Sequence, residues 1–436
     1  MKSRSVFSVD LYILLSTLGL VVVGVLFIYS SGINSTGELI SREYLRQIVW
    51  AGTGLLILAG FFFMDYERLY NIAAPLFAAT LLLLVVTLLF GRVVNGARSW
   101  LGIGGLGVQP SEFAKVATII FLAKLAQDRR LGGLKGFLLG LGVAIVPTLL
   151  VLAQPDLGTA MVFIPIFLGI AFFNGSRMRH ILFIVLSTLL LAYFTVLPAW
   201  EQYVAGEHIP AISLLTEPRL LGAILIAVGL IGLLSFIGHL VRQRGAFYWV
   251  AYGSTILFLA LAGGYAARRV LQDYQLMRII VFLDPYVDPR GAGWNIIQSV
   301  TAVGSGGAFG KGFLQGTHSH YQYLPQQSTD FIFSILAEEW GFIGSLAVFT
   351  LFTLILGRGV YILSQAKNRF ASSLAAGVVS MLFFHFIINV GMTIGVMPIT
   401  GIPLFFLSYG GSSLWTGMIA VGLLMSIYSH RYSYTG

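Results

Sequence analysis

The sequence predicts an all-α protein that crosses a membrane many times. Of its 436 residues, 57% are hydrophobic and only 10% are charged, and the mean hydropathy is +0.88. Soluble domains carry roughly 25% charged residues. The apolar residues also form long runs, and a helix needs about 20 such residues to span a bilayer. These observations predict a single integral membrane domain over residues 1–436.

Twelve apolar runs along the chain are candidate spans. The first follows the N-terminal MKSRSVFSVD, and it is too long for a signal-peptide core and lacks a small-residue cleavage site, so we expect it to remain as a span. Tight turns at Gln154 and Pro398 separate two pairs of neighbouring runs. The predicted spans cover residues 11–30, 47–64, 73–90, 113–126, 136–153, 157–173, 180–198, 219–240, 247–267, 331–356, 372–396 and 404–428.

Positive charges are unevenly distributed between the loops. With a cytoplasmic N-terminus, every second loop carries most of the lysines and arginines, as the positive-inside rule requires. The rule then predicts that both termini are cytoplasmic and that the polar segment 268–330 lies outside. The cations predicted to be inside are Lys2, Arg4, Arg68, Lys124, Arg129, Arg130, Lys135, Arg177, Arg179, Arg242, Arg244, Arg358, Lys367, Arg369 and Arg431.

Composition excludes several classes of function. The net charge of +9 is scattered over short loops and not gathered on one face, so we expect no nucleic-acid partner. The sequence has no cysteine, which excludes disulfides, thiolate catalysis and Cys-ligated metal centres. Twelve spans also suit a transporter built from two repeats, but the halves share no motif.

The longest polar segment, residues 271–345, is rich in Gly, Asp, Arg and His. Because polar loops between spans are where water and chemistry meet, we expect it to cover the outer mouth of a membrane-embedded active site. An earlier outer loop holds Arg98 and Trp100 between glycine-rich turns. Trp100 fits equally an anchor at the membrane interface and a contact to substrate.

Two outer turns share a pattern, Gln-Pro-Ser-Glu at 109–112 and Gln-Pro-Asp at 154–156. Proline followed by an acid typically starts a helix, so Glu112 and Asp156 could serve only as caps. Lys115 is harder to explain, because a cation in the first turns of a helix opposes the helix dipole and would lie at membrane depth. It requires a partner, either Glu112 or an anionic ligand.

Asp330 and Glu338 lie at the end of the polar segment. Asp330 opens an apolar helix, so it is either an N-cap or first-turn acid of that helix or a functional acid. Glu338 follows eight residues later, about two helical turns, so we expect both acids on one helical face. Acids at membrane depth are costly unless they face protein or water, which favours function. The outer cations that could together bind a phosphate are Arg98, Lys115, Arg268, Arg269, Arg278, Arg290 and Lys311.

Familiar catalytic motifs are absent from the sequence. GSGGAFGKG at 304–312 lacks the spacing and the preceding strand of a nucleotide-binding P-loop. His318 and His320 lie in a loop and His385 lies within a span. None forms the spacing of a zinc site or a Ser-His-Asp triad, so we expect no catalytic metal held by protein side chains alone.

Seven segments resemble the SEDS family of membrane proteins, in the family's order and over nearly the whole chain. Among them, GKGFLQGT at 310–317 is more similar to members that serve cell elongation than to those that serve division. The segments are NGARSW at 95–100, QPSEFAK at 109–115, QPDLGTA at 154–160, FLDPYVDPRGAGWNIIQS at 282–299, GSGGAFGKGFLQGT at 304–317, LPQQSTDFIFSILAEEWG at 324–341 and GIPLFFLSYGGSS at 401–413.

The resemblance implies a peptidoglycan glycosyltransferase at the outer face of the bacterial cytoplasmic membrane, which polymerises lipid II into glycan strands. It implies that Asp330, the acid of the family's Thr-Asp-Phe motif, is catalytic. A class B penicillin-binding protein, a transpeptidase, would be the partner. The expected substrate-binding residues are Arg98, Trp100, Glu112, Lys115, Asp156, Arg278, Lys311 and Glu338.

The chain departs from the family pattern in two places. The family usually has ten spans, so residues 199–266 look like an inserted loop and helix pair. An inserted pair leaves every other loop on its own side of the membrane. Phe405 stands where the family commonly has a second proline, which leaves the bend before the last helix unsupported.

Transfer from a polyprenyl-pyrophosphate sugar requires the acceptor 4-hydroxyl to lose a proton while the pyrophosphate leaves. We assign Asp330 as the general base and the outer cations as an electrostatic clamp on the pyrophosphate. A single base without a covalent intermediate predicts inversion at the sugar. The sequence leaves open a divalent cation, Mg²⁺ or Mn²⁺, between the pyrophosphate and Asp330.

Two other functions use the same residues. In a lipid II flippase, the cations would guide the head group and Asp330 would sense protons. A scaffold without chemistry would only position a partner synthase, and it would leave the outer acids and cations unexplained.

Overall fold

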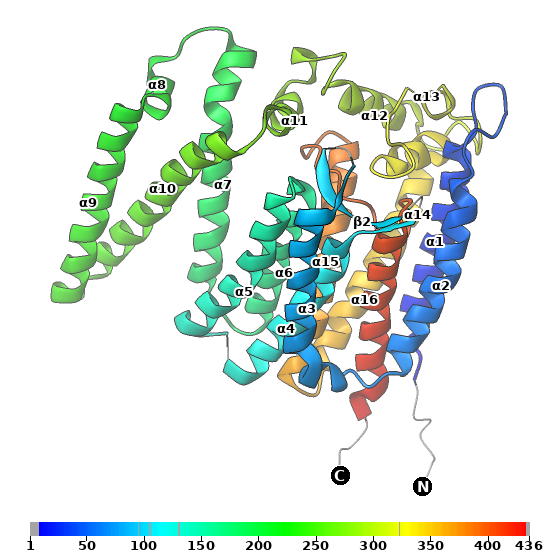
Figure 1. Cartoon of the computed structure of the whole chain (residues 1–436), viewed down its shortest axis with the longest axis horizontal. Helices are drawn as coiled ribbons and strands as arrows, with labels where there is room; N and C mark the ends of the chain where they lie inside the picture. The colour runs from blue at the N-terminus through cyan, green and yellow to red at the C-terminus, as the bar shows by residue number, and fades with distance from the viewer. Residues whose placement is uncertain (1–7, 95, 104–105, 130, 322, 433–436) are drawn as a thin grey trace. The chain divides into compact units, whose positions relative to one another are not determined.

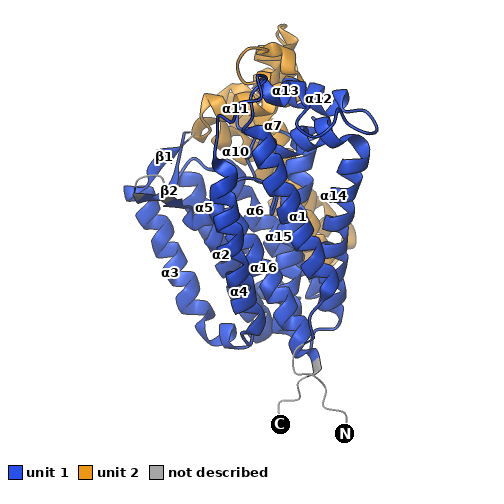
Figure 2. Cartoon of the chain, turned by 90° about the vertical axis from the view of Figure 1, so that its right-hand side faces the viewer, with its two compact units in different colours: residues 1–176, 298–436 blue, residues 177–297 orange. Residues whose placement is uncertain are grey.

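The computed structural model describes residues 8–94, 96–103, 106–129, 131–321 and 323–432. The chain folds into two compact units (Figure 2). Unit 1 comprises Met1–Ser176 and Gln298–Gly436, and unit 2 comprises Arg177–Ile297. Both are built mainly from helices, as the hydropathy pattern predicts.

Ten helices of the described residues are long and apolar enough to cross a membrane. They are α1 (Leu11–Ser31), α2 (Glu43–Phe63), α3 (Arg68–Phe90), α5 (Leu134–Ala153), α7 (Met178–Trp200), α9 (Pro218–Arg242), α10 (Gly245–Val270), α14 (Ile332–Ser364), α15 (Arg369–Thr393) and α16 (Gly411–Ser429). The two remaining predicted spans correspond to α4 (Pro110–Arg129), which carries internal charges, and to α6 (Leu157–Phe173), which has only 17 residues. The all-α polytopic membrane fold is therefore confirmed, with a helix at every predicted position.

Helices α15 and α16 form the centre of unit 1 (Figure 1). Within the most apolar stretch of each helix, 72% of α15 and 89% of α16 is buried, against 28% for α2 and for α3. α15 packs on α4, α6 and α14, while α16 packs on α2. The outer helices leave large apolar side chains such as Leu56 and Leu82 exposed, because lipid tails would cover them as well as protein does.

The loops of unit 1 lie at its two ends. At one end, where α1 begins and α16 ends, Arg358 pairs with Asp10 at 2.6 Å and Lys124 donates to the Tyr70 carbonyl at 3.1 Å. The strands and α13 (Thr317–His320) lie at the opposite end (Figure 2), which we call the loop end. Its residues are 91–94, 96–103, 106–109, 154–156, 306–321, 323–331 and 394–410.

The predicted start of the last span at residue 404, and the tight turn at Pro398, are wrong. Residues 394–410 form a long non-helical segment, and α16 begins only at Gly411. Phe406 has a φ of +70° and Gly401 one of +72°, a left-handed backbone that no helix contains. The apolar run here is buried among helices and not in lipid, so the hydropathy pattern misplaced the boundary. The bend before α16 is present although Phe405 replaces a proline.

A small antiparallel sheet that the sequence did not reveal follows α3. It consists of β1 (Arg92–Val94), β2 (Ala97–Ile103) and β3 (Leu106–Val108), in the order β1-β2-β3. Trp100 pairs with Arg92, and Gly102 pairs with Gly107. Short strands rich in glycine carry little periodic signal, which explains the omission. The tight turn predicted at Gln154 is confirmed, since α5 ends at Ala153 and α6 begins at Leu157.

Unit 2 contains α7, α8 (Pro210–Thr216), α9, α10 and α11 (Asp273–Leu283). α10 packs on both α7 and α9, and Leu215, Leu221 and Leu261 form a buried apolar cluster. The expected helix pair of residues 199–266 is therefore formed as α9 and α10. That this pair is an insertion stays a prediction.

The segment 268–330, expected as one long loop, contains short helices. α10 extends to Val270, and α11, a 3₁₀ turn at Pro285–Val287, α12 (Trp294–Ser305) and α13 follow. α11 has a capping box, in which Gln272 and Gln275 bond each other's backbone. Capping of this kind stabilises helices too short to form alone.

Candidate functional site

Asp330 lies in a turn at the loop end and not in a helix. The turn covers residues 325–331, in which the amides of Thr329 and Asp330 donate to the Gln326 carbonyl at 3.2 and 3.1 Å. α14 begins at Ile332, and the position before it is Phe331, which supplies no side-chain cap. The N-cap explanation of Asp330 is therefore wrong. The Asp330 side chain is half-buried and does not start the helix.

Buried polar groups hold this turn in place. The Nδ2 of Asn389, on α15, donates to the Asp330 carbonyl at 2.9 Å and to the Ile402 carbonyl at 2.8 Å. The amide of Tyr409 donates to the Ser328 carbonyl at 2.8 Å. Backbone carbonyls of the Asp330 turn are thus bonded by the Asn389 side chain and by the Tyr409 amide, which fixes the turn to the centre of unit 1.

Tyr409 also carries a titratable group close to the turn. Burial raises the pKa of its phenol above the usual value, and Arg46 opposes this rise. The phenol therefore stays neutral at physiological pH and adds no charge beside the Asp330 turn.

Lys115 lies in a buried cluster at the start of α4. Its Nζ is 2.7 Å from Glu112 Oε1, one turn earlier, and 3.0 Å from His385 Nε2. All three residues are at most 1% exposed, and Lys115 also lies over the Phe405 ring, 5.4 Å from its centre. The partner that the sequence required for Lys115 is Glu112, while the second partner, His385, was missed.

Asp156 caps α6, as one of its two explanations predicted. Its Oδ1 accepts from the Thr159 amide at 3.1 Å, and its Oδ2 accepts from Gln109 Nε2 at 3.0 Å. The backbone amide of Gln109 donates to Ser412 Oγ at 3.0 Å. The two Gln-Pro turns therefore join the starts of α4, α6 and α16.

Arg98 and Trp100 lie on β2, at the same end of unit 1. The Arg98 amide donates to the Gln154 carbonyl at 3.0 Å, which fixes the sheet over the end of α5. The Arg98 side chain is exposed, and Trp100 is half-buried. Trp100 covers Gly107, where a Cβ atom would lie 3.0 Å from its ring.

Glu338 holds the segment before α13, and the expectation that it shares a helical face with Asp330 is wrong. Asp330 precedes the helix, so helical spacing does not relate the two acids. Glu338 Oε1 lies 2.7 Å from Lys311 Nζ and accepts from Thr317 Oγ1 at 3.0 Å and from the His318 amide at 2.9 Å. Its buried carboxylate is satisfied within the fold, and Lys311 remains 26% exposed.

The glycine-rich segment GSGGAFGKG inserts into a break in α14. Gly341 has φ +64° and ψ −158°, so the helix loses its regular bonds there. The amides of Lys311 and Gly312 donate to the Glu338 and Glu339 carbonyls at 3.0 and 2.9 Å. A Cβ at Gly310 would lie 2.0 Å from the Glu339 carbonyl oxygen. The glycines therefore allow close backbone contact and do not cradle a nucleotide, in line with the sequence-based exclusion.

Glu339 ties this segment to α1. Its buried carboxylate accepts from the Ser30 hydroxyl and from the Leu314 amide at 3.0 Å, and it lies 3.6 Å from His320 Nε2. The adjacent acids Glu338 and Glu339 of α14 thus bond to different residues of the loop 311–318. Both side chains are buried and stabilise this loop.

Four predicted phosphate-binding cations belong to unit 2, namely Arg268, Arg269, Arg278 and Arg290. Arg278 stacks over Tyr274 at 5.7 Å, Arg268 donates to the Leu215 carbonyl at 2.6 Å, and Arg269 donates to the Tyr265 hydroxyl at 2.9 Å. Arg268 and Arg269 therefore have contacts that organise unit 2 itself.

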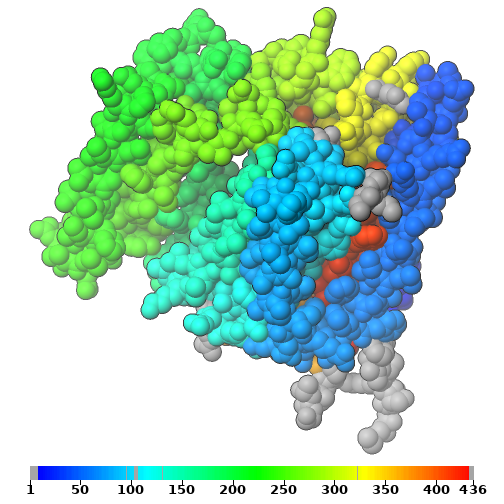
Figure 3. All heavy atoms as spheres, viewed as in Figure 1, coloured from blue at the N-terminus to red at the C-terminus, as the bar shows by residue number. Residues whose placement is uncertain are grey.

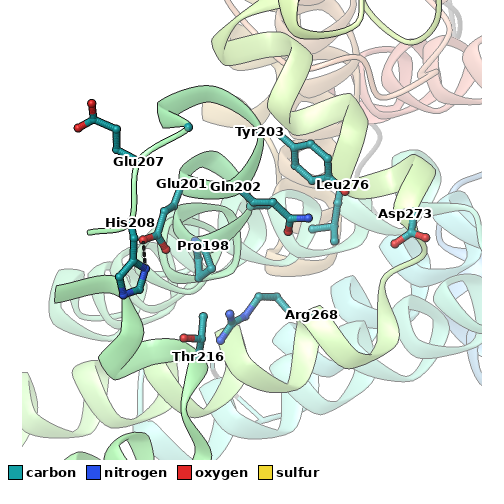
Figure 4. Close-up of a pocket in the computed structure, with 12 residues that line it drawn as sticks. Pro198, Glu201, Gln202, Tyr203, Glu207, His208, Thr216, Arg268, Asp273 and Leu276 are labelled. Carbon is teal, nitrogen blue, oxygen red and sulfur yellow. Dashed lines mark ion pairs between the residues drawn. The ribbon is translucent and has the colours of Figure 1, made fainter. Parts of the chain in front are cut away.

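Unit 2 also contains a polar cavity of about 520 Å³ (Figure 4). It lies between the ends of α7, α10 and α11, and within it Glu201 pairs with His208 at 3.2 Å. Arg268 and Asp273 line its other side.

Comparison with known proteins identifies the family. The family model for FtsW, RodA and SpoVE, described as "Cell cycle protein", matches residues 10–205 and 199–433. This chain belongs to that family. The SEDS resemblance drawn from the seven segments is thereby confirmed.

Individual SEDS relatives match over nearly their whole length. The chain is 48% identical over 429 residues to peptidoglycan glycosyltransferase RodA of Treponema pallidum, covering 98% of this chain and 99% of that protein. It is 34% identical over 424 residues to peptidoglycan glycosyltransferase MrdB of Escherichia coli K12, covering 97% and 94%. Stage V sporulation protein E of Bacillus subtilis is 34% identical over 436 residues, covering 98% of each.

Solved structures share the SEDS fold. A chain of a structure described as "Structural coordination of polymerization and crosslinking by a peptidoglycan synthase complex" aligns with a TM-score of 0.66 at 27% identity, covering 98% of this chain and 99% of that one. Thermus thermophilus RodA aligns with a TM-score of 0.61 at 24% identity and the same coverage. Together with the ten span-length helices, these matches identify the chain as a multi-pass membrane protein.

Sequence reasoning missed several buried polar residues beside the site. His385 and Asn389 are four residues apart on α15 and are at most 1% exposed. Their spacing within an apolar span was a usable signal, because polar side chains at membrane depth usually face a functional interior.

Proposed function

We infer that this SEDS chain is a peptidoglycan glycosyltransferase that polymerises lipid II at the outer face of the cytoplasmic membrane. The observation that carries the inference is the loop end of unit 1. There the Asp330 turn is bonded through Asn389 to the centre of a membrane fold, in a chain similar over its full length to proteins named peptidoglycan glycosyltransferases. We assign the chain to cell elongation because it is 48% identical to RodA and only 30% identical to a relative named FtsW.

The proposed chemistry is a single displacement. The Asp330 carboxylate takes the proton of the acceptor 4-hydroxyl, and that oxygen bonds to the anomeric carbon of the donor. The bond from this carbon to the pyrophosphate breaks at the same time, and polyprenyl pyrophosphate leaves. A general base contributes typically 10²- to 10⁴-fold, and attack from the opposite face inverts the sugar.

The expected substrate-binding residues divide into two groups by exposure. Arg98 and Lys311 are at least partly exposed, so we assign them to the pyrophosphate, with Trp100 as a surface for the sugar. Arg278 lies in unit 2, and its contact with the substrate stays a prediction. Lys115 is buried and paired, so its charge would act through the field inside the protein, where Coulomb interactions are stronger than in water. Glu112 and Glu338 would act through the lysines that they hold, and Asp156 through the helix that it caps.

A divalent cation on the pyrophosphate stays a prediction. Among the described residues, no group of three or more His, Asp or Glu side chains could hold a metal ion. Asp330 together with the pyrophosphate oxygens would have to supply the ligands of such a cation.

The orientation of the protein supports a substrate outside the cell. Lys124 and Arg358, which the positive-inside rule assigns to the cytoplasm, make their contacts at the end of unit 1 opposite the loop end. The loop end would then face outward, and both termini would be cytoplasmic.

Polymerisation by the purified protein tests this function. Detergent-solubilised protein is given labelled lipid II, and the products are separated by size. A glycosyltransferase makes polymer in detergent, whereas a flippase needs two separated compartments and makes none. Active protein whose polymer yield is unchanged by Asp330→Asn would contradict the assigned base.

A further inference from the structure

α15 presents two polar side chains to the non-helical segment 401–410. His385 and Asn389 are four residues apart and therefore lie on one helical face. His385 Nδ1 lies 3.0 Å from the Pro403 carbonyl oxygen, and Asn389 Nδ2 lies 2.8 Å from the Ile402 carbonyl oxygen. Two consecutive carbonyls of the segment are thus bonded to one turn of α15.

Each of these side chains also reaches a residue of the candidate site. The second hydrogen of the Asn389 amide goes to the Asp330 carbonyl at 2.9 Å, so both of its donors are used. His385 Nε2 lies 3.0 Å from Lys115 Nζ. Because the Pro403 carbonyl can only accept, Nδ1 carries the hydrogen of the neutral ring, and Nε2 accepts from the lysine.

The segment itself is anchored at its other end. Its Tyr409 amide donates to the Ser328 carbonyl of the Asp330 turn at 2.8 Å. Gln47 of α2 donates to the Ser408 carbonyl at 3.2 Å and accepts from the Gly410 amide at 3.2 Å. Segment 401–410 is therefore bonded to α15, to α2 and to the Asp330 turn, and buried polar networks whose bonds are made rigidify the fold around them.

We propose that His385 and Asn389 are positioning residues, which fix the Asp330 turn and the Lys115 ammonium relative to each other through segment 401–410. The proposal rests on the proposed function. Removing the hydrogen bonds of either side chain should therefore lower turnover and leave lipid II binding intact. A misplacement of a catalytic group by about 1 Å lowers the rate on the order of 10²-fold.

The first test replaces Asn389 by leucine, which has a similar volume and no donor. The matched control is Asn174→Leu, because Asn174 Nδ2 also donates twice, to the Ile170 carbonyl and to Ser373 Oγ of α15, both at 2.8 Å. We expect Asn389→Leu to lower kcat at least tenfold with KM for lipid II within about twofold, and Asn174→Leu to leave both near the parent values. Equal losses in the two variants, or a rise in KM alone, would overturn the proposal.

The second test uses His385. His385→Phe keeps a ring against Phe405, whose centre lies 4.1 Å away, but loses both hydrogen bonds. His385→Gln keeps one donor and one acceptor. We expect turnover to fall at least tenfold in the phenylalanine variant and to be restored at least in part in the glutamine variant. Equal activity of the two variants would contradict positioning by hydrogen bonds.

A third measurement is independent of activity. The chain has no cysteine, so two cysteines can be introduced at positions 328 and 409 without interference from others. Because the backbones of Ser328 and Tyr409 are hydrogen-bonded, oxidative cross-linking of this cysteine pair reports how close the two positions are. We expect the cross-linked fraction to fall severalfold when Asn389→Leu is added and to stay unchanged with Asn174→Leu. An unchanged fraction with Asn389→Leu overturns the positioning role. If the parent protein makes no polymer, the proposed function fails, while this result still decides the positioning.

Discussion

The Nζ of Lys115 lies 2.7 Å from Oε1 of Glu112, and neither side chain is more than 2% exposed. Both belong to the first turns of α4, where the helix dipole opposes the lysine charge. A buried ammonium of this kind is stable only with a counter-charge and further hydrogen-bond partners. Glu112 supplies the first and His385 contributes to the second.

Glu112→Gln should therefore destabilise the protein strongly, by about 3–5 kcal/mol, because it leaves the ammonium buried without a counter-charge. Thermal unfolding of the detergent-purified protein measures this loss. The double variant Glu112→Gln/Lys115→Met should regain most of the stability, because no buried charge is left unpaired. It should be inactive, because it lacks the Lys115 charge. If the single variant melts like the parent, the ion pair does not contribute to the fold as we describe.

Asp330→Asn should reduce polymer formation below about a tenth of the parent rate, given the usual size of a general-base contribution. Its melting temperature should stay near that of the parent, because the Asn389 side chain and the Tyr409 amide still bond the backbone carbonyls of the turn. Single-turnover product formation from lipid II is the measurement. A variant that keeps more than a tenth of the rate would remove Asp330 from the role of base.

Gly341→Ala should destabilise the loop end. Its φ of +64° is unfavourable for alanine, and the added Cβ would lie 2.2 Å from the Gly310 amide nitrogen. Gly357→Ala, in the same helix, is the matched control, because its Cβ would meet nothing within 4 Å and alanine favours a helix by up to about 1 kcal/mol. Limited proteolysis of the loop end and melting curves compare them, and equal stability of both variants would refute the close contact.

The helix pair α9 and α10 should be dispensable for chemistry if it is inserted. Only 6% of the most apolar stretch of α9 and 22% of that of α10 is buried, so removal of the pair would expose mainly the face of α7 on which α10 packs. Deleting residues 205–262 should leave a folded enzyme with a polymerisation rate similar to that of the parent. A folded but inactive product would make the pair part of the catalytic unit.

A class B penicillin-binding protein should raise the polymerisation rate. One of the similar structures belongs to a peptidoglycan synthase complex. Partner binding to segment 268–330, which we expect to lie outside, would increase the fraction of protein in its active arrangement. The rate is measured while the purified transpeptidase is titrated, with binding followed separately. An unchanged rate at saturation would reduce the association to tethering.

Much of this description could be predicted from local patterns. Apolar runs predicted a helix at each of the twelve positions, because burial in lipid imposes a length and a composition that a single sequence displays. The two Gln-Pro turns and the partner of Lys115 could also be predicted, since caps and pairs three residues apart are local. These features depend only on neighbours along the chain.

The arrangement of the site depends on contacts between distant segments. The sequence could not show that residues 394–410 leave the helix, because their apolar side chains are covered by protein and resemble those covered by lipid. Nor could it show that Glu338 binds Lys311, 27 residues away, or that Asn389 joins Asp330 to Ile402. By itself the sequence determined the membrane class, the family and the positions of the spans, except for the start of the last one. Only the tertiary structure decided which buried polar groups meet, since each of them must find a partner wherever packing brings one.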